Sequence, residues 1–139
     1  MLRRATEHDI ARIFEIRNSV RENRLNDPAK VTVDDVSWFI ASPGIFLWEA
    51  NAQVVGFSAA DPRNGSIWAL FIDQAFEGRG IGRLLLARAC VVLQEAGFAR
   101  MWLTTDPGTR AEKFYRVAGW QAVGRKGSEL LFEKDIAGA

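Results

Sequence analysis

Residues 72–87 read IDQAFEGRGIGRLLLA, and this stretch decides the fold. Its central part contains glycines at positions 78, 80 and 82 and lacks apolar periodicity. Apolar residues then recur at helical spacing from Leu85 onward, whereas residues 66–72 form a strongly apolar run typical of a central strand. Glycine lets the backbone approach a ligand closely, and the free N–H groups at a helix start attract an anion. The stretch therefore predicts a strand, an anion-binding loop and a helix, in that order.

The spacing of the glycines excludes two common phosphate-binding loops. No Gly-Lys-Ser/Thr follows, so the loop is not a P-loop. The dinucleotide fingerprint fails because the third glycine is wrongly spaced and because the loop lies in the middle of the chain. A glycine-rich turn that merely permits tight packing is the alternative to an anion site.

The patterns on either side of this stretch predict an α/β domain. Thr6 and Asp9 form a capping box for a first helix that runs to about Val20, and a polar loop follows over residues 21–30. Thr109 and Glu112 form a second box, before a helix that stops at residue 119. The other predicted helices cover residues 32–41 and 83–97, and the predicted strands cover residues 45–50, 53–60, 66–72, 100–105, 120–125 and 129–134.

The composition excludes several classes of protein. The 139 residues suffice for a single domain over residues 1–139, and 18 basic against 17 acidic residues argue against a strongly basic nucleic-acid binder. One cysteine, Cys90, and one histidine, His8, form neither an internal disulfide nor a zinc site. The opening MLRRATEHDI lacks the apolar core of a signal peptide, and no apolar run is long enough to span a membrane. We therefore expect a soluble, cytoplasmic protein that uses no metal.

Two motifs together resemble one enzyme family. Residues 72–87 are similar to the acetyl-CoA signature of the GNAT N-acetyltransferases, which has Arg/Gln-x-x-Gly-x-Gly/Ala at a strand-to-helix junction. Residues 111–120, AEKFYRVAGW, are similar to the A-x-x-x-Tyr-x-x-x-Gly-Phe/Trp helix of the same family. The motifs occur in the expected order and separation, and residues 5–124 follow the family's order of elements.

The resemblance implies a mixed, mostly antiparallel sheet with helices on both faces. Its central parallel strands, residues 66–72 and 100–105, would splay apart and bind acetyl-CoA between them. In this family the loop N–H groups bind the pyrophosphate, and the preceding strand pairs with the pantetheine arm. An N–H near Phe71 or Ile72 would polarise the acetyl carbonyl. Carried over residue by residue, the cofactor-binding positions are Leu70, Phe71, Ile72, Gly78, Arg79, Gly80, Ile81, Gly82, Arg83, Thr109 and Tyr115.

Two residues depart from the family pattern. Glu77 stands where the family has Arg or Gln, and a carboxylate there repels the pyrophosphate unless it points to solvent or pairs with Arg79. We therefore expect weaker cofactor binding rather than none. Gly108 stands where many relatives have an Asn that faces the cofactor, and Thr109 is the residue expected to compensate.

The family reaction is direct attack by a primary amine on the thioester, and Tyr115 matches its general acid. The reference pKa of tyrosine is ~10 and that of a thiol ~8.5, so full proton transfer to the thiolate is uphill by ~2 kcal/mol. A hydrogen bond from Tyr115 therefore contributes as much as proton delivery. Considered without the resemblance, Tyr115 better fits a half-buried helix tyrosine with a satisfied hydroxyl. The candidate base is Glu22 in the loop after the first helix, with a water chain or a merely solvated glutamate as alternatives.

Three further residues have structural interpretations. Cys90 lies on the apolar stripe of its helix, so it is expected in the core rather than as a nucleophile. His8 is expected to be exposed in a first helical turn. Trp68 alternates with Ala69 along its strand, and it fits either the core or a wall of an acceptor pocket.

The sequence therefore predicts an acetyl-CoA-dependent N-acetyltransferase. The acceptor stays open between a small amine, an amino acid and a peptide or protein amine. A non-catalytic acyl-CoA-binding module and a protein-interaction domain are the alternative classes. Relatives commonly form homodimers, and the apolar final strands are the expected contact.

Overall fold

The computed structural model describes residues 1–19 and 31–136. Within them, one sheet contains seven strands in the order β1-β2-β3-β4-β5-β7-β6. The strands are β1 (Leu2–Arg4), β2 (Ile45–Ala50), β3 (Gln53–Asp61), β4 (Ser66–Ile72), β5 (Arg100–Thr105), β6 (Gln121–Lys126) and β7 (Glu129–Asp135). The helices are α1 (Ile10–Ser19), α2 (Val33–Ala41), α3 (Ile81–Glu95) and α4 (Arg110–Val117), with short 3₁₀ helices η1 (Glu7–Asp9) and η4 (Gln74–Phe76).

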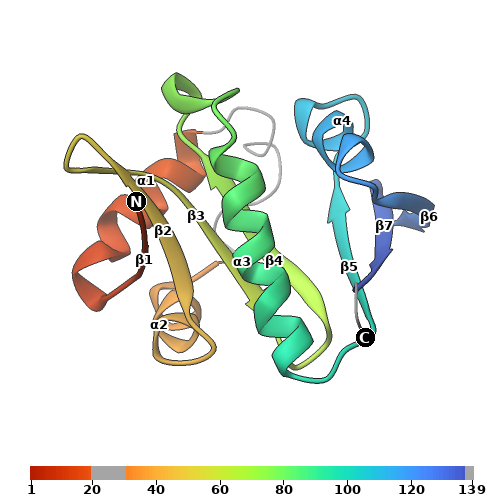
Figure 1. The fold of residues 1–139 in the computed structure, drawn as a ribbon, viewed down its shortest axis with the longest axis horizontal. Helices are drawn as coiled ribbons and strands as arrows, with labels where there is room; N and C mark the ends of the chain where they lie inside the picture. Colours follow the sequence, from red (N-terminus) through yellow and green to blue (C-terminus); the bar gives the residue numbers. More distant parts are fainter. Residues whose placement is uncertain (20–30, 137–139) are drawn as a thin grey trace.

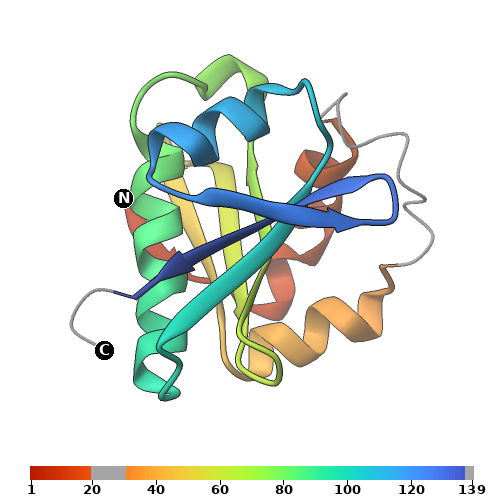
Figure 2. The same ribbon diagram turned by 90° about the vertical axis from the view of Figure 1, so that its right-hand side faces the viewer.

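The molecule has three layers, with α1 and α2 on one face of the sheet and α3 on the other (Figures 1 and 2). All neighbouring strands are antiparallel except β4 and β5. One buried cluster joins α1 and α2 to the sheet, and a second joins α3 and α4 to β5 and β7. The predicted mixed, mostly antiparallel sheet with helices on both faces is therefore confirmed. None of the described helices is long and apolar enough to cross a membrane.

The two parallel strands separate soon after they begin. In the described part of the chain they share a single bridge, between Ser66 and Trp102, whereas β3 pairs along most of β4. Beyond this bridge β4 and β5 diverge toward their carboxyl ends (Figure 1). The predicted splay of the central strands is confirmed.

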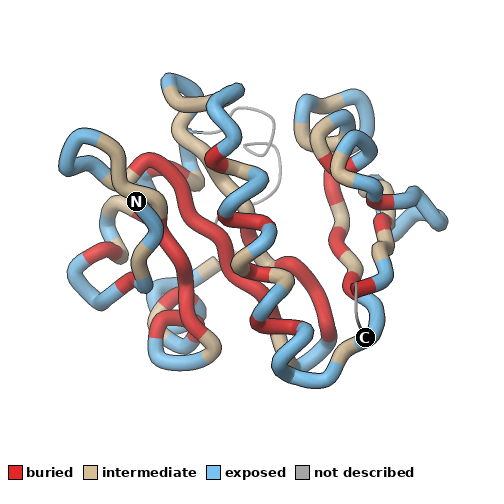
Figure 3. Tube along the Cα trace, in the orientation of Figure 1, coloured by how far each residue is buried: buried red, intermediate tan, exposed pale blue. Residues whose placement is uncertain are grey.

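Burial follows the position of each strand in the sheet. Most of β3 is buried, because α3 covers one of its faces and α1 the other, whereas every residue of β6 is exposed (Figure 3). An apolar side chain contributes stability in proportion to the area that it removes from water, so β3 anchors the fold and β6 does not. The strand β4, which precedes the glycine loop, therefore pairs with the most buried strand of the sheet.

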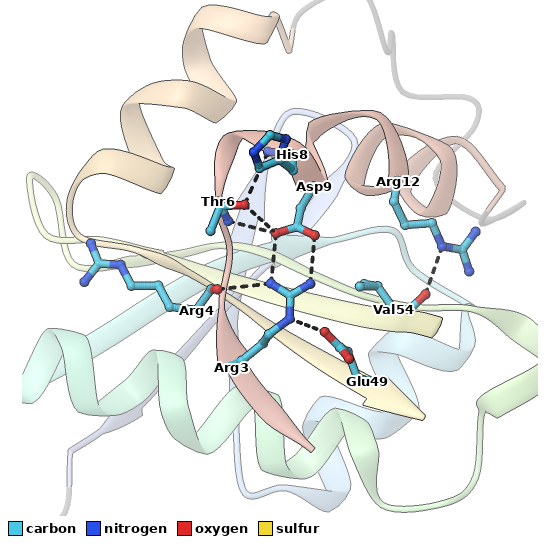
Figure 4. A network of polar contacts seen from close by, with 8 residues as sticks. All are labelled: Arg3, Arg4, Thr6, His8, Asp9, Arg12, Glu49 and Val54. Atoms are coloured by element: carbon cyan, nitrogen blue, oxygen red, sulfur yellow. Dashed lines mark hydrogen bonds and ion pairs between the residues drawn. The ribbon is translucent and has the colours of Figure 1, made fainter. Parts of the chain in front are cut away.

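The strand β1 was not predicted, because three residues with two arginines lack a strand pattern. It is held by the Arg3 guanidinium, which donates two hydrogen bonds of 2.9 Å to the Asp9 carboxylate and also pairs with Glu49 (Figure 4). Asp9 in turn accepts from the Thr6 N–H at 2.8 Å, which completes the predicted capping box. This box caps the 3₁₀ helix η1, and α1 follows η1 directly. His8 lies in η1 and is exposed, as expected.

Replacement Asp9→Asn is expected to lower the free energy of unfolding by about 2 kcal/mol, because it weakens hydrogen bonds to a charged partner at a buried position. The hydrogen bonds from Arg3 hold the pKa of Asp9 below its ordinary value. Its contribution is therefore fully present above the unfolded-state pKa of ~3.9 and is lost as the pH falls through the folded-state value. Urea unfolding at several pH values should show the two proteins converging in acid.

The control for this variant is Asp135→Asn, which weakens the exposed pair with Arg100. Solvent screens that pair, so little change is expected. Equal losses in both variants, or a difference that does not depend on pH, would contradict the assignment.

The strand β4 contains an irregularity that strict alternation does not predict. The register with β3 shifts between Ala59 and Ala60, which makes Trp68 the extra residue of a bulge. Trp68 and Ala69 consequently both lie in the cluster beneath α1 and α2, whereas alternation would put them on opposite faces. The Trp68 ring stacks on Phe39 with 4.0 Å between centroids.

Candidate active site

The end of β4 directs peptide groups toward the gap that opens beside it. In an antiparallel ladder the peptide groups of a strand point alternately to its two sides. The Asp73 N–H donates to the Val55 carbonyl at 2.8 Å, so the peptide groups of Asp73 point toward β3. Together with the register of β3 and β4, this bond fixes which residues of β4 point toward β3 and which point away from it. The N–H and C=O of Phe71 therefore face β3, and those of Leu70 and Ile72 face the β5 side. Backbone hydrogen bonds to a ligand were expected from Leu70, Phe71 and Ile72. Because the peptide groups of Phe71 face β3, only Leu70 and Ile72 remain candidates for such bonds.

The glycine loop lies at the carboxyl end of β4 and leads into α3. Gly78 and Gly80 have φ of +77° and +81°, and a Cβ on either would meet no atom within 4 Å. Gly80 is also the N-cap of α3, which starts at Ile81, slightly before the predicted start. Among the described helices, α2 and α4 each have a threonine cap, whereas no side chain caps α3. The open space and the uncapped N–H groups fit an anion such as a pyrophosphate.

The carboxylate of Glu77 is neutralised from across the opening. Its Oε2 lies 2.8 Å from the Arg110 guanidinium at the start of α4. Pairing with Arg79, one of the arrangements that would relieve the repulsion, is not formed, because the Arg79 guanidinium lies over the Phe76 ring, whereas α4 brings the Arg110 guanidinium within reach. The ion pair reduces the repulsion that Glu77 would exert on an anion in the loop.

Tyr115 projects from α4 into the core between the two halves of the sheet. It is 7% exposed, and its ring packs edge-on against Trp120 with 5.8 Å between centroids. Burial raises the pKa of Tyr115 above its ordinary value, and the nearby Cys90 adds to the shift. The hydroxyl therefore stays protonated at neutral pH, as a hydrogen-bond donor requires.

A small pocket of about 70 Å³ lies on the opposite face of the sheet, beneath α1 and α2. Trp68, Ala69 and Phe71 of β4 form one of its walls. Trp68 thus packs in the core, as expected, and also lines this pocket.

The family model for the acetyltransferase (GNAT) family matches residues 9–120, which include the glycine loop and α4. The chain belongs to the GNAT family. A curated relative, the uncharacterized N-acetyltransferase ycf52 of Pyropia yezoensis, is 29% identical over 75 residues. The match covers 52% of this chain and 42% of that protein, so the chain spans less than half the length of this relative.

Solved structures share the GNAT fold at low sequence identity. An acetyltransferase of the GNAT family from Staphylococcus aureus Mu50 has a TM-score of 0.80 at 15% identity, covering 98% of both chains. The PaiA N-acetyltransferase of Thermoplasma acidophilum, solved with coenzyme A, has a TM-score of 0.77 at 16% identity. That match covers 97% of this chain and 98% of the other. At these identities the likeness shows the fold alone.

Two of the predicted site residues, Thr109 and Glu22, need separate comment. The Thr109 hydroxyl donates to the Asp106 carbonyl at 2.8 Å and accepts from the Glu112 N–H at 3.2 Å, so the start of α4 already uses it. The Glu112 carboxylate accepts from the Gly108 N–H at 2.7 Å and not from the Thr109 N–H, so the predicted second capping box is incomplete. Glu22, the candidate base, lies outside the described residues.

Cys90 packs against the cluster that contains Tyr115, as expected for a core residue of this GNAT protein. Burial raises the pKa of its thiol to about 11, although Lys134 opposes the shift. At neutral pH its thiolate fraction should be roughly a hundredfold below that of a free cysteine. A thiol reagent should react slowly with the native protein and quickly after unfolding, and Cys90→Ala should retain turnover. Rapid labelling together with loss of turnover would contradict this.

Proposed function

We propose that the protein is an acetyl-CoA-dependent N-acetyltransferase that acts on a primary amine. One observation carries the proposal: β4 and β5 separate, and a glycine loop that leads into an uncapped helix lies at the end of β4, beside this separation. Such a split leaves room for an extended chain beside β4, and the loop offers N–H groups to the phosphates at one end of that chain. GNAT membership over residues 9–120 supports the same reaction.

Acetyl-CoA supplies an acyl thioester whose carbonyl carbon accepts the amine and whose sulfur leaves. The residues that would hold it are Leu70 and Ile72 through their peptide groups and residues 78–83 through their N–H groups, with Arg79 and Arg83 adding positive charge. The Glu77–Arg110 pair lies beside the loop and lowers the net negative charge there. Thr109 remains a weaker candidate contact, since its hydroxyl is used within α4.

The Ile72 N–H is the proposed donor to the acetyl oxygen. Its peptide group faces the β5 side, and the bonding of β3 with β4 fixes its direction. A donor held in advance where negative charge develops stabilises the transition state without reorganisation. The strand therefore serves both to bind and to polarise.

Tyr115 is the proposed proton donor to the departing sulfur. As the C–N bond forms and the C–S bond breaks, the amine loses a proton to a base or water and the sulfur gains a hydrogen bond from the tyrosine. The raised pKa of Tyr115 makes complete proton transfer unfavourable, so hydrogen bonding is its main contribution. Glu22 or a water chain would accept the proton of the amine.

Calorimetric titration with acetyl-CoA and with free CoA tests the binding step. We expect micromolar affinity, about −8 kcal/mol. A screen of primary amines that follows CoA release then tests the transfer. Binding without any amine-dependent release would instead assign the protein to the non-catalytic acyl-CoA-binding class, and absence of binding would exclude both.

Location and assembly are further parts of the proposal. We place the reaction in the cytoplasm, and we propose a homodimer formed through the last strands. The strand β6 is exposed along its whole length, and its Val123 is 52% exposed. Light scattering that gives the mass of a monomer would exclude the dimer.

A further inference from the structure

The pocket beneath α1 and α2 has apolar walls and a single charged side chain among its described lining residues. Ile13 and Val36 line it from the helices, and Trp68 and Phe71 line it from β4. The charged residue is Arg17 of α1. A pocket of this composition suits a molecule with an apolar body and one anionic group.

Among the described residues, Arg17 has no carboxylate partner of the kind that Arg3 and Arg12 have. Arg12, one turn earlier on α1, lies 3.0 Å from Asp73, and Arg3 pairs with Asp9 at 2.9 Å. Within the described residues, no carboxylate pairs with Arg17, whose guanidinium lies 6.0 Å from the centroid of the Phe71 ring. Burial lowers the pKa of Arg17, which reflects the loss of water around the charge. With no carboxylate partner in the described part of the chain, this partly desolvated cation would be stabilised by a bound anion.

The pocket is well placed for the acceptor of the proposed reaction. Phe71 lies between Leu70 and Ile72, whose peptide groups face the opening between β4 and β5. The glycine loop leads into α3 on one face of the sheet, whereas α1 and α2 lie on the other (Figure 2). The pocket is lined by residues of these two helices and of β4. A molecule in the pocket would thus approach the end of β4 from the side opposite α3.

We propose that Arg17 binds a carboxylate of the acceptor, so that the acceptor class is amino acids with an apolar side chain rather than simple amines. The inference rests on the proposed N-acetyltransferase function and names its substrate class. The guanidinium would hold the carboxylate, and the amine of the same molecule would face the end of β4. Because the pocket measures only about 70 Å³, its aliphatic and aromatic walls would contact part of the side chain, and the rest of the molecule would lie at the open mouth of the pocket.

The test uses probes that do not react. The CoA-saturated protein is titrated with N-acetylglycine, N-acetyl-L-leucine and N-acetyl-L-phenylalanine, and with N-(3-methylbutyl)acetamide, which is N-acetyl-leucine without its carboxylate. We expect at least one acid to bind, and Arg17→Gln to weaken it by roughly 10- to 100-fold, as for loss of a hydrogen bond to a charged group. Arg17→Lys should restore part of the affinity, and the uncharged amide should bind weakly to all variants.

Two controls keep the outcome unambiguous. Arg100→Gln removes the same charge from an exposed site on β5 and should bind the acids as the wild type does. Arg17→Gln should bind acetyl-CoA normally, which separates loss of the pocket from loss of the fold. If none of the acids binds, or if Arg17→Gln binds them as tightly as the wild type, the inference is overturned.

Failure of the proposed function would look different. If the wild type does not bind acetyl-CoA, the same acids are titrated without CoA, and their dependence on Arg17 still decides the inference. If transfer occurs, kcat/KM for L-leucine should exceed that for 3-methylbutylamine, and Arg17→Gln should remove most of the difference. A preference for the simple amine in the wild type would overturn the inference and leave the transferase intact.

Discussion

Replacement Tyr115→Phe is expected to lower kcat by roughly 100-fold while the affinity for acetyl-CoA stays unchanged. The change removes only the hydroxyl, and the phenyl ring retains its packing against Trp120 and Phe132. Since the hydroxyl acts on the departing sulfur, its loss should affect the chemical step and not binding. Steady-state kinetics with the best amine of the screen, together with calorimetry, measures both quantities.

The pH dependence provides a second readout for Tyr115. Because burial raises its pKa, the hydroxyl should remain protonated over the usual assay range, and the wild-type profile should show no loss of activity from its ionisation. The variant should therefore be slower by a similar factor at every pH. Unchanged turnover in a variant that unfolds at the wild-type temperature would remove Tyr115 from the mechanism.

Replacement Gly80→Ala is expected to weaken acetyl-CoA binding by roughly 5- to 30-fold, the equivalent of about 1–2 kcal/mol. An alanine at φ +81° is strained, and without a ligand the exposed loop can relieve the strain by changing its conformation. Binding then has to restore the left-handed backbone, so the cost falls on affinity. Calorimetric titration with acetyl-CoA measures it.

The matched control is Gly97→Ala at the other end of α3. Gly97 has φ of +93°, and a Cβ there meets no atom within 4 Å, so the backbone strain is comparable and there is no steric clash. This variant should lose thermal stability but bind acetyl-CoA normally. Equal affinity of the two variants would show that the glycine loop does not hold the cofactor.

The elements that the sequence predicts well are those whose signals are local. Residues 72–87 contain the strand end, the glycines and the helix start in one continuous stretch, and the capping residues Thr6 and Thr109 mark the starts of η1 and α4. The strand β1 has no such signal. It pairs with β2, which lies more than 40 residues later in the chain, and the Arg3 side chain adds contacts with Asp9 and Glu49.

The residues of the candidate site likewise differ in how well the sequence predicts them. The glycine loop is predicted from the local spacing of its glycines, whereas Tyr115 is singled out only by the resemblance of residues 111–120 to the GNAT family motif. The ion-pair partner of Glu77 is not predicted from the sequence, since Arg110 comes close to Glu77 only when α4 packs beside the loop. Arg17 was not singled out either. On the sequence it resembles any surface arginine, and only the folded pocket shows that it lacks a carboxylate partner among the described residues.

An open sheet normally has two edge strands, but the separation of β4 from β5 gives this one four. The outer edges are β1 and β6, and past the Ser66–Trp102 bridge the inner flanks of β4 and β5 are edges as well. Unpaired strand edges invite pairing with other chains, which is a route to aggregation. A cofactor lying along β4 would cover one inner edge and link the two parts of the sheet. Acetyl-CoA should therefore act on solubility as well as on catalysis, and the cofactor-free protein should aggregate sooner on heating than the loaded one.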